Sequence, residues 1–505
     1  MRTRRIAALG AVVVLAAACG TTVKSGSGHS GGSSSNGLSM PSGPSQNSPT
    51  NGSSPSGANS GSGGALAGSG SGSGSSGGGS YAVGSSGSGT GGPGVTSKFV
   101  GANAPGVTNQ TMYVGVEYSS QSAQADRAIG AAGAAPSYDF RNVFNAAVNY
   151  ANTHGGFAGR KLQPLYFDFN VTTDTNTQDQ SACAYWTQDN KVFAIASEDP
   201  LQIACAEKAG AVPISAPAAT EATFQQNPHL VDPEATALDR QGSVTVSGLY
   251  RAGYFSGKLG LVTWDDPAYR ATISNGYLPA LSSHHITPAQ IAYISVPQQL
   301  GAVADMTAAV SSAVQKFKAL GIDHVIVQDG HAGVWAGDGL TLEWMNQAKS
   351  QGYYPRYGMN SGNNPGASIN PSDEMNKGLA VDDVDYDKQY DQGWHANPAR
   401  DLCYQIEAAA GYPVSSSNAN DEGLASQACD AVFFLQRVVN GITTTINNNS
   451  FVAQAQTLGT GFAPALVYGA KLFQGRRDGG DMFRTEEYLS SCSCLQYQGP
   501  PAYVD

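Results

Sequence analysis

The segment from Phe140 to Thr220 constrains the fold of this chain more than any other. Apolar residues recur at helical spacing from about Tyr138 to Asn152, and Gly155 and Gly156 provide the positive-φ positions that end a helix. Two strand-like runs with an intervening polar helix follow, and the segment closes on the small-residue sequence AVPISAPAAT. This βαβα alternation predicts an α/β unit with a parallel sheet, whose strand-end loops are suited to hold a small ligand.

The same alternation starts again after about residue 242. Strand patterns occur at Leu259–Trp264, Ile291–Val296 and His324–Gln328, each followed by a helix pattern. The run LAVDDVDYD is predicted as a strand leaving this second unit, and two helices and a β-rich tail follow it. The order predicts two α/β units that are discontinuous in sequence and joined by several crossovers.

The N-terminus has the features of an export signal. Arg2, Arg4 and Arg5 precede an apolar run, Ile6–Ala18, that is too short to span a bilayer as a mature helix. The run ends in LAAAC, which resembles the signal peptides of lipoproteins (residues 1–19) and implies that Cys19 carries a lipid anchor to the cell membrane. The alternative is an ordinary secretory signal with a chance cysteine.

Residues 20–108 are almost entirely Gly, Ser, Asn, Pro and Thr. Such a composition cannot bury enough apolar surface to offset chain entropy, so we expect a disordered tether. A Gly/Ser coil of this length reaches roughly 50 Å. It would hold a folded domain away from a membrane.

Charge and cysteine content bear on the binding partners and on the cellular location of the protein. The 505-residue chain has a formal net charge of −11 and no basic run, which argues against nucleic-acid binding. Six cysteines remain once Cys19 is set aside, and an even number in an exported protein suggests disulfides. Proximity favours the pairs Cys183–Cys205, Cys403–Cys429 and Cys492–Cys494. Zinc at the last pair is the alternative, but a second ligand pair at the required spacing is missing.

Three motifs carry a resemblance to a known family. The runs GGFAGRKL, VFAIAS and VPISAPAAT, spread over Gly155–Thr220, resemble type I periplasmic binding proteins, and within them the branched-chain amino-acid, amide and urea class of ABC-importer solute receptors. The later pattern GRRDGGDMFR…CSC is similar to lipoprotein members of that class. The resemblance covers about Thr111–Tyr497.

The resemblance implies an α/β fold of two Rossmann-like lobes with three hinge crossovers and a ligand cleft between the lobes. The expected division is lobe 1 (residues 109–238 and 382–468), lobe 2 (residues 239–381) and a tail returning to lobe 2 (residues 469–505).

In lobe 1 the resemblance places ligand contacts at Ser197 and in the loop Ala218, Ala219 and Thr220, with Tyr118 as a candidate wall of the cleft. Hydroxyls and free helix N-terminal N–H groups suit a carboxylate or carbonyl. The alternatives are that Ser197 only caps a helix and that Thr220 is a turn residue.

In lobe 2 the resemblance places contacts in the loop after His324–Gln328, at Asp329 and His331, and at Ser361. The family often has an acid at the Ser361 position to pair with a ligand ammonium, and this chain has none there. Glu198, Asp265 and Asp329 are candidates to replace it. Asp329 and His331 could equally be solvated loop residues, and Asp265 and Asp266 could cap the next helix.

No motif indicates an enzyme. The glycine-containing run Gly253–Leu259 has one spacer too few for a phosphate-binding loop, and H-E-x-x-H is missing from the sequence. A carboxylate pair assembled by folding would still allow a glycosidase. We therefore expect a lipid-anchored receptor, without cofactor or metal, that delivers a small polar solute to an ABC permease by hinge closure. The alternatives are an extracytoplasmic sensor and a surface interaction protein with a degenerate cleft.

Overall fold

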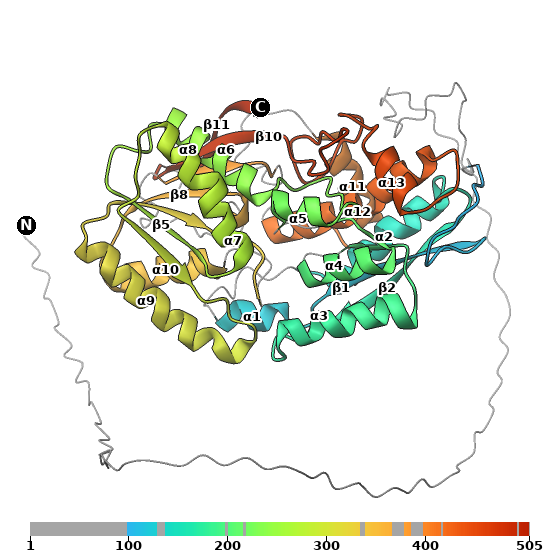
Figure 1. Ribbon diagram of the computed structural model, residues 1–505, viewed down its shortest axis with the longest axis horizontal. Coiled ribbons are helices and arrows are strands. Elements are labelled where there is room, and N and C mark those ends of the chain that lie inside the picture. The colour runs from blue at the N-terminus through green and yellow to red at the C-terminus, as the bar shows by residue number, and fades with distance from the viewer. Residues whose placement is uncertain are drawn as a thin grey trace, which may run out of the picture. The chain divides into compact units, whose positions relative to one another are not determined.

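The computed structural model describes residues 98–128, 137–196, 200–215, 219–333, 339–365, 378–384, 397–415, 418–491 and 494–503. The signal peptide, Cys19 and most of the tether lie outside these ranges. The described chain forms two α/β lobes, each built on one sheet (Figure 1).

Lobe 1 is built on a parallel sheet in the order β2-β1-β3-β4. A glycine in β1 allows a buried tryptophan to pack directly on the sheet, because a Cβ at Gly115 would lie 2.8 Å from the Trp186 ring. The strands are β1 (Thr111–Tyr118), β2 (Lys161–Asp168), β3 (Ala194–Ala196) and β4 (Val212–Pro213).

Lobe 2 has a seven-stranded sheet in the order β11-β10-β9-β8-β7-β5-β6. Strands β5 to β9 pair in parallel, and the last two strands of the chain add an antiparallel hairpin. The strands are β5 (Leu259–Trp264), β6 (Gln290–Ile294), β7 (His324–Gln328), β8 (Arg356–Asn360), β9 (Leu379–Asp382), β10 (Met482–Leu489) and β11 (Cys494–Tyr503).

Helices cover both sheets, as the α/β pattern predicts. Two of them are interrupted by π-helical turns, Tyr185–Asp189 after α3 and Thr272–Tyr277 between α7 and α8. The helices are α1 (Ser122–Ala128), α2 (Phe140–Thr153), α3 (Thr175–Ala184), α4 (Pro200–Ala209), α5 (Glu221–Gln226), α6 (Leu238–Arg251), α7 (Pro267–Ala271), α8 (Leu278–Ser283), α9 (Val303–Ala319), α10 (Gly339–Ser350), α11 (Pro398–Ala409), α12 (Ala419–Gly441) and α13 (Asn448–Ala455).

The start and end of α2 follow from local chemistry. The Asp139 side chain caps the helix by accepting from the Arg141 N–H, and Gly155 and Gly156 after its end have φ of 106° and 63°. The apolar face of α2 belongs to the same core cluster as α12, so helices from the late part of the chain complete lobe 1 (Figure 1).

Most predicted elements are confirmed, two predicted strands differ from the structure, and three short helices were not predicted. The short helices α1, α5 and α13 were not predicted from the sequence. The strand-like run APALVYG contributes only an isolated bridge between Val467 and Val384. The strand predicted to run from Leu379 to Asp387 ends at Asp382.

The predicted tether is too long at its C-terminal end. Residues 98–108 pack against lobe 1: Ala102 bridges Ile446, and Arg160 donates to the carbonyls of Val100 and Thr108. The Arg160 guanidinium also lies 4.4 Å from the centre of the Phe99 ring. Because this stretch contains Phe and Val, it has apolar surface to bury, unlike the Gly/Ser-rich residues before it.

Three crossovers join the lobes side by side. The first, residues 231–237, pairs with the third, residues 478–481, through the Gly479 N–H to Asp232 carbonyl bond of 2.7 Å. Thr236 Oγ1 donates to the Gly480 carbonyl (2.9 Å) and approaches Asp383 of the second crossover (3.4 Å). The GRRDGGD run is therefore hinge sequence. The predicted boundary between lobe 1 and the C-terminal tail, at residue 469, lies too early in the chain. Ala470 and Leu472 still belong to the lobe 1 core.

Two of the three predicted disulfides are confirmed, Cys183–Cys205 and Cys403–Cys429. The first ties α3 to α4, and the second ties α11 to α12. Cys492 and the side chain of Cys494 lie outside the described part of the chain, so their pairing stays a prediction. Among the described helices, none has the length and apolar character needed to cross a membrane.

Candidate ligand-binding site

The strand order identifies where each lobe presents its loops. In lobe 1 the chain runs from β1 to β2 on one side and places β3 on the other, and in lobe 2 β5 has β6 and β7 on its two sides. At such switch points the loops diverge, which leaves room for a ligand outside the carboxyl ends of the strands. The predicted contact residues follow these strand ends.

Tyr118 is the last residue of β1 and is half-buried. The Arg141 guanidinium lies 4.1 Å from the centre of its ring, and Tyr166 meets it edge-on at 6.0 Å. Burial, followed by the nearby Asp168 carboxylate, raises the pKa of Tyr118, so its hydroxyl stays protonated at neutral pH. Asp139 holds the Arg141 side chain through a 2.6 Å ion pair. The predicted wall residue thus belongs to an aromatic and cationic cluster, and the Arg141 member of this cluster was not predicted.

The second predicted loop of lobe 1 is only partly described. Thr220 is 4% exposed and caps the short helix α5: its hydroxyl accepts from the Thr223 N–H at 3.2 Å. Ala219 is buried in an apolar cluster with Phe224. Thr220 is thus a helix cap, which is neither the turn residue of the alternative nor a demonstrated ligand contact, and its hydroxyl also lies 3.0 Å from Thr223 Oγ1. Ser197, Glu198 and Ala218 lie outside the described residues, so their roles stay predictions.

Asp329 is fully buried instead of lying in a solvated loop. Its Oδ1 accepts from Trp264 Nε1 (2.8 Å) and the Gly330 N–H (2.9 Å), and its Oδ2 accepts from the N–H and Oγ1 of Thr341 (2.7 and 2.8 Å). Burial raises the pKa of Asp329 to about 7 despite these four donors. All of these bonds are within lobe 2, which makes Asp329 a support of the loop.

A buried polar network continues from Asp329 below the strand ends. Tyr277 Oη donates to Gln328 Oε1 (2.7 Å), and Asn360 Nδ2 donates to the same Gln328 oxygen (2.7 Å). Each of these side chains is fully buried. Because such a network fixes the directions of its members, it holds the ends of β7 and β8 in place under the loops that carry His331 and Ser361.

His331 and Ser361 are half-buried at these two strand ends. The His331 carbonyl accepts from Tyr269 Oη at 2.9 Å. Ser361 donates its hydroxyl to Asp383 Oδ1, and the Asp383 N–H donates back to Ser361 Oγ at 3.0 Å. A carboxylate therefore does stand beside the Ser361 position, supplied by the neighbouring strand.

The sequence analysis missed Asp383. It is 3% exposed, and burial, together with the adjacent Asp382, raises its pKa to about 7. The signal was the paired acids in LAVDDVDYD. The predicted strand ran through them, whereas β9 ends at Asp382 and so places Asp383 at the carboxyl edge of the sheet.

The other predicted acid of lobe 2 is already paired. Asp265 forms a 2.5 Å ion pair with Arg270, whose guanidinium lies 4.1 Å from the centre of the Tyr293 ring. Asp266 caps α7 by accepting from the Ala268 N–H at 2.8 Å, as the capping alternative predicts. Asp383, directly after β9, differs from these acids in that it accepts hydrogen bonds from two hydroxyls, those of Thr236 and Ser361.

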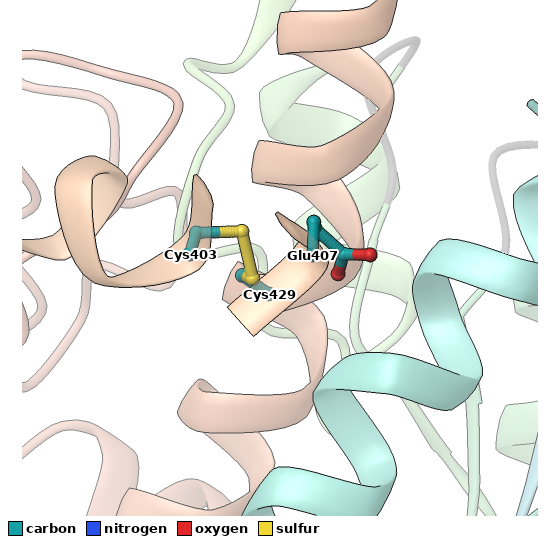
Figure 2. A group of neighbouring side chains, drawn as sticks. All are labelled: Cys403, Glu407 and Cys429. Atoms are coloured by element: carbon teal, nitrogen blue, oxygen red, sulfur yellow. A yellow bond between two sulfur atoms is a disulfide. The ribbon is translucent and has the colours of Figure 1, made fainter. Parts of the chain in front are cut away.

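One group among the described residues has metal-ligand spacing, Cys403, Glu407 and Cys429, whose ligand atoms lie within 4.8 Å of one another. The two sulfurs are joined in the disulfide, with the Glu407 side chain beside them (Figure 2). A disulfide has no thiolate to offer a metal. The arrangement is therefore a buried carboxyl group next to a structural cross-link.

A cavity of about 250 Å³ opens elsewhere, between late lobe 1 residues and the C-terminal strands. It contains no predicted ligand residue. Its lining is Asn397, Pro398, Thr460, Phe462, Ala463, Pro464, Tyr468, Gly469, Ala470, Met482 and Tyr503.

No protein-family model matches the sequence, and no curated protein is similar enough to be counted as a relative. Solved structures do match the fold. An ABC transporter substrate-binding protein from Desulfitobacterium hafniense, in complex with Leu, is 14% identical with a TM-score of 0.51, over 77% of this chain and 100% of that one.

Two further structures give the same result. A branched-chain amino-acid ABC transporter protein from Thermus thermophilus with bound valine is 14% identical, with a TM-score of 0.55 over 80% of this chain and 98% of its own. A solute-binding protein from Rhodopseudomonas palustris HaA2 in complex with p-hydroxybenzoic acid is 12% identical, with a TM-score of 0.56 over 78% and 97%. With its two sheets, three crossovers and these neighbours, the chain has the type I periplasmic binding protein fold.

Proposed function

We propose that this protein is a lipid-anchored extracytoplasmic receptor that binds a small polar solute and delivers it to an ABC importer. The observation that carries the proposal is the position of hydrogen-bonding groups at the carboxyl ends of strands in both lobes, next to three adjacent crossovers. Ligand binding between lobes joined in this way favours the closed arrangement, because only that arrangement makes contacts from both sides.

In lobe 1 the ligand would lie against Tyr118 and the loop of Thr220. The Tyr118 ring offers a flat apolar face and a protonated hydroxyl, and Arg141 beside it offers a positive charge. Ser197 at the end of β3 would complete this side. These groups suit a solute with a carboxylate or carbonyl at one end.

In lobe 2 the ligand would meet His331 and the Ser361–Asp383 pair. Asp383 is a buried carboxylate that accepts hydrogen bonds from two described hydroxyls, those of Thr236 and Ser361. A cationic or N–H-rich group on the solute would stabilise its ionised form. We therefore favour an amino acid, an amide or a similar solute. The structural neighbours bind both amino acids and a hydroxybenzoate, so an aromatic acid against Tyr118 belongs in the same test.

The test is a thermal-shift screen of the mature protein against amino acids, amides, urea and hydroxybenzoates, followed by calorimetry on each hit. Asp383→Asn and the pair Ser197→Ala with Thr220→Ala should weaken binding at least about tenfold, a loss of two or more hydrogen bonds. Asp305→Asn, at an exposed acid in α9, is the control and should not change the affinity.

Three outcomes would contradict the proposal or part of it. A protein that binds none of these solutes but captures a protein partner would be an interaction module. Binding that is unaffected by either variant would place the site elsewhere. Binding without any loss of solute uptake when the gene is deleted would favour a sensor over a transport receptor.

A further inference from the structure

A second contact between the lobes lies away from the crossovers. It joins the loop after β2 and the start of α3 in lobe 1 to the loop after β6 in lobe 2. We call it the mouth contact and define it as Val171, Thr175 and Asn176 of lobe 1 with Gln298 and Leu300 of lobe 2.

Hydrogen bonds cross this contact in both directions. The Leu300 N–H donates to the Val171 carbonyl at 2.8 Å, and the Thr175 N–H donates to the Gln298 carbonyl at 2.9 Å. The side-chain oxygen of Gln298 accepts from Thr175 Oγ1 and from Asn176 Nδ2, the latter at 3.3 Å. Gln298 thus holds both the backbone and the side chains at the start of α3.

Apolar burial accompanies these bonds. Val171 belongs to lobe 1 by its place in the chain, yet it is 6% exposed and is part of a core cluster whose other members are lobe 2 residues. Burial of this valine side chain favours association of the two lobes. Separating the lobes would expose it again.

The strand orders place the mouth contact far from the crossovers. β2 is the edge strand of the lobe 1 sheet and β6 is an edge strand of the lobe 2 sheet, whereas the crossovers emerge beside β4 in lobe 1 and beside β9 and β10 in lobe 2. The mouth contact and the crossovers therefore lie at opposite sides of the strand ends that carry the proposed ligand contacts. A hinge motion displaces atoms most where they are farthest from the hinge.

The loop is also fixed relative to the proposed ligand site. Gln178 Nε2 donates to the Asn170 carbonyl (2.8 Å), and the Asn170 N–H donates to Gln178 Oε1 (2.6 Å). The Phe169 N–H donates to the carbonyl of Tyr118 at 2.8 Å. Movement of the mouth contact is therefore linked to the wall residue at the end of β1.

We propose that the mouth contact is a latch: Gln298 is a positioning residue that holds the lobes closed and, for the receptor proposed above, slows release of the bound solute. The inference concerns the lobes themselves, and only its second half rests on the proposed function. The bonds of the latch cross between lobes, so they must break each time the lobes open.

The test is amide hydrogen exchange by mass spectrometry on the mature protein, with no solute added. Thr175 is the first residue of α3, so its N–H has no acceptor within the helix, and its protection depends on the backbone carbonyl of Gln298. Gln298→Ala keeps this carbonyl and removes the side-chain bonds to Thr175 Oγ1 and Asn176 Nδ2, so the lobes should separate more often. Gln298→Ala should speed exchange of the amides of Thr175 and Leu300 about tenfold, which corresponds to about 1.4 kcal/mol.

Two variants make the result specific. Gln298→Glu keeps an acceptor oxygen for Thr175 and Asn176 and should preserve protection. Gln299→Ala changes the adjacent, exposed glutamine and should match the unchanged protein. Exchange of the Thr175 amide at the rate of an unprotected amide, or equal exchange in Gln298→Ala and Gln299→Ala, would overturn the latch. Because the exchange measurement needs no solute, it tests the latch even if the solute screen finds no ligand.

Discussion

Replacing Glu407 with glutamine should change how the stability of the protein depends on pH. The Glu407 side chain extends from α11, is fully buried beside the Cys403–Cys429 disulfide (Figure 2), and has no hydrogen-bond partner for either carboxylate oxygen among the described residues. Burial alone raises its pKa from 4.5 to about 8. Replacement by glutamine removes the titration with little change in volume and breaks no hydrogen bond of the carboxylate.

The size of the effect follows from linkage. The pKa is raised in the folded state, so the stability contributed by proton binding is fully present below the unfolded-state pKa and is lost as the pH rises through about 8. At about 1.36 kcal/mol per unit, the part lost between pH 5 and pH 8 is about 3.5 kcal/mol. Glu407→Gln should therefore gain about that much free energy of unfolding, relative to the unchanged protein, over this pH interval.

The assay is urea denaturation of both proteins at pH 5 and pH 8 under non-reducing conditions. Asp329, Asp383 and Asp430 also have pKa values raised to about 7 by burial, so the unchanged protein should itself lose stability over this interval. Only the difference between proteins isolates Glu407. Asp189→Asn, at an exposed acid, is the control and should keep the original slope. A Glu407→Gln slope equal to that of the control would refute the assigned cause.

Three further outcomes are expected. Gly479→Ala should destabilise the hinge by about 1–3 kcal/mol, measured by denaturation, because its Cβ would lie 2.4 Å from the Pro233 carbonyl oxygen. Cys183→Ser with Cys205→Ser should cost about 3 kcal/mol of unfolding free energy, and a loss near zero would contradict the confirmed cross-link. Solute affinity should depend on pH near 7 and lose that dependence in Asp383→Asn, because burial raises the Asp383 pKa to about 7 and a cationic solute would favour its ionised form. Calorimetry at pH 5.5 and pH 8 would show this.

The fold could be predicted from the sequence because its signals are local and repeated. Hydrophobic periodicity identified most of the strands and long helices, and the glycines after α2 set its end. The elements missed have weak local signals. α5 has six residues and depends on the capping box of Thr220 and Thr223, and α13 likewise begins at a capping box, formed by Asn447 and Ser450. The predicted strand at APALVYG has the right composition, but within the described part of the chain it forms only the bridge between Val467 and Val384.

The site was harder to predict because burial is a property of the assembled fold. Asp329 follows a strand and so was expected in a polar loop, but Trp264 and Thr341 come from other elements and enclose it. Asp383 was not predicted because it lies beside Ser361 only through the pairing of β8 with β9. Which strands pair is a property of the topology and cannot be read from residue spacing. The spacing of residues in a motif locates them along one strand, but it carries no information on which residues of an adjacent strand lie beside them.

The three regions that act on a solute in this scheme are separate in the chain, and their effects are separable by measurement. The glycines of the third crossover decide which lobe arrangements are sterically accessible, so changes there should alter stability first. Gln298 decides how long the closed arrangement lasts, so changes there should raise the dissociation rate and leave the association rate nearly unchanged. In the proposed receptor Asp383 and Tyr118 contact the solute, so changes there should reorder affinities among solutes. A Gln298 variant that changes solute preference would mean that the loop after β6 contacts the solute directly, and the latch would then be part of the binding site itself.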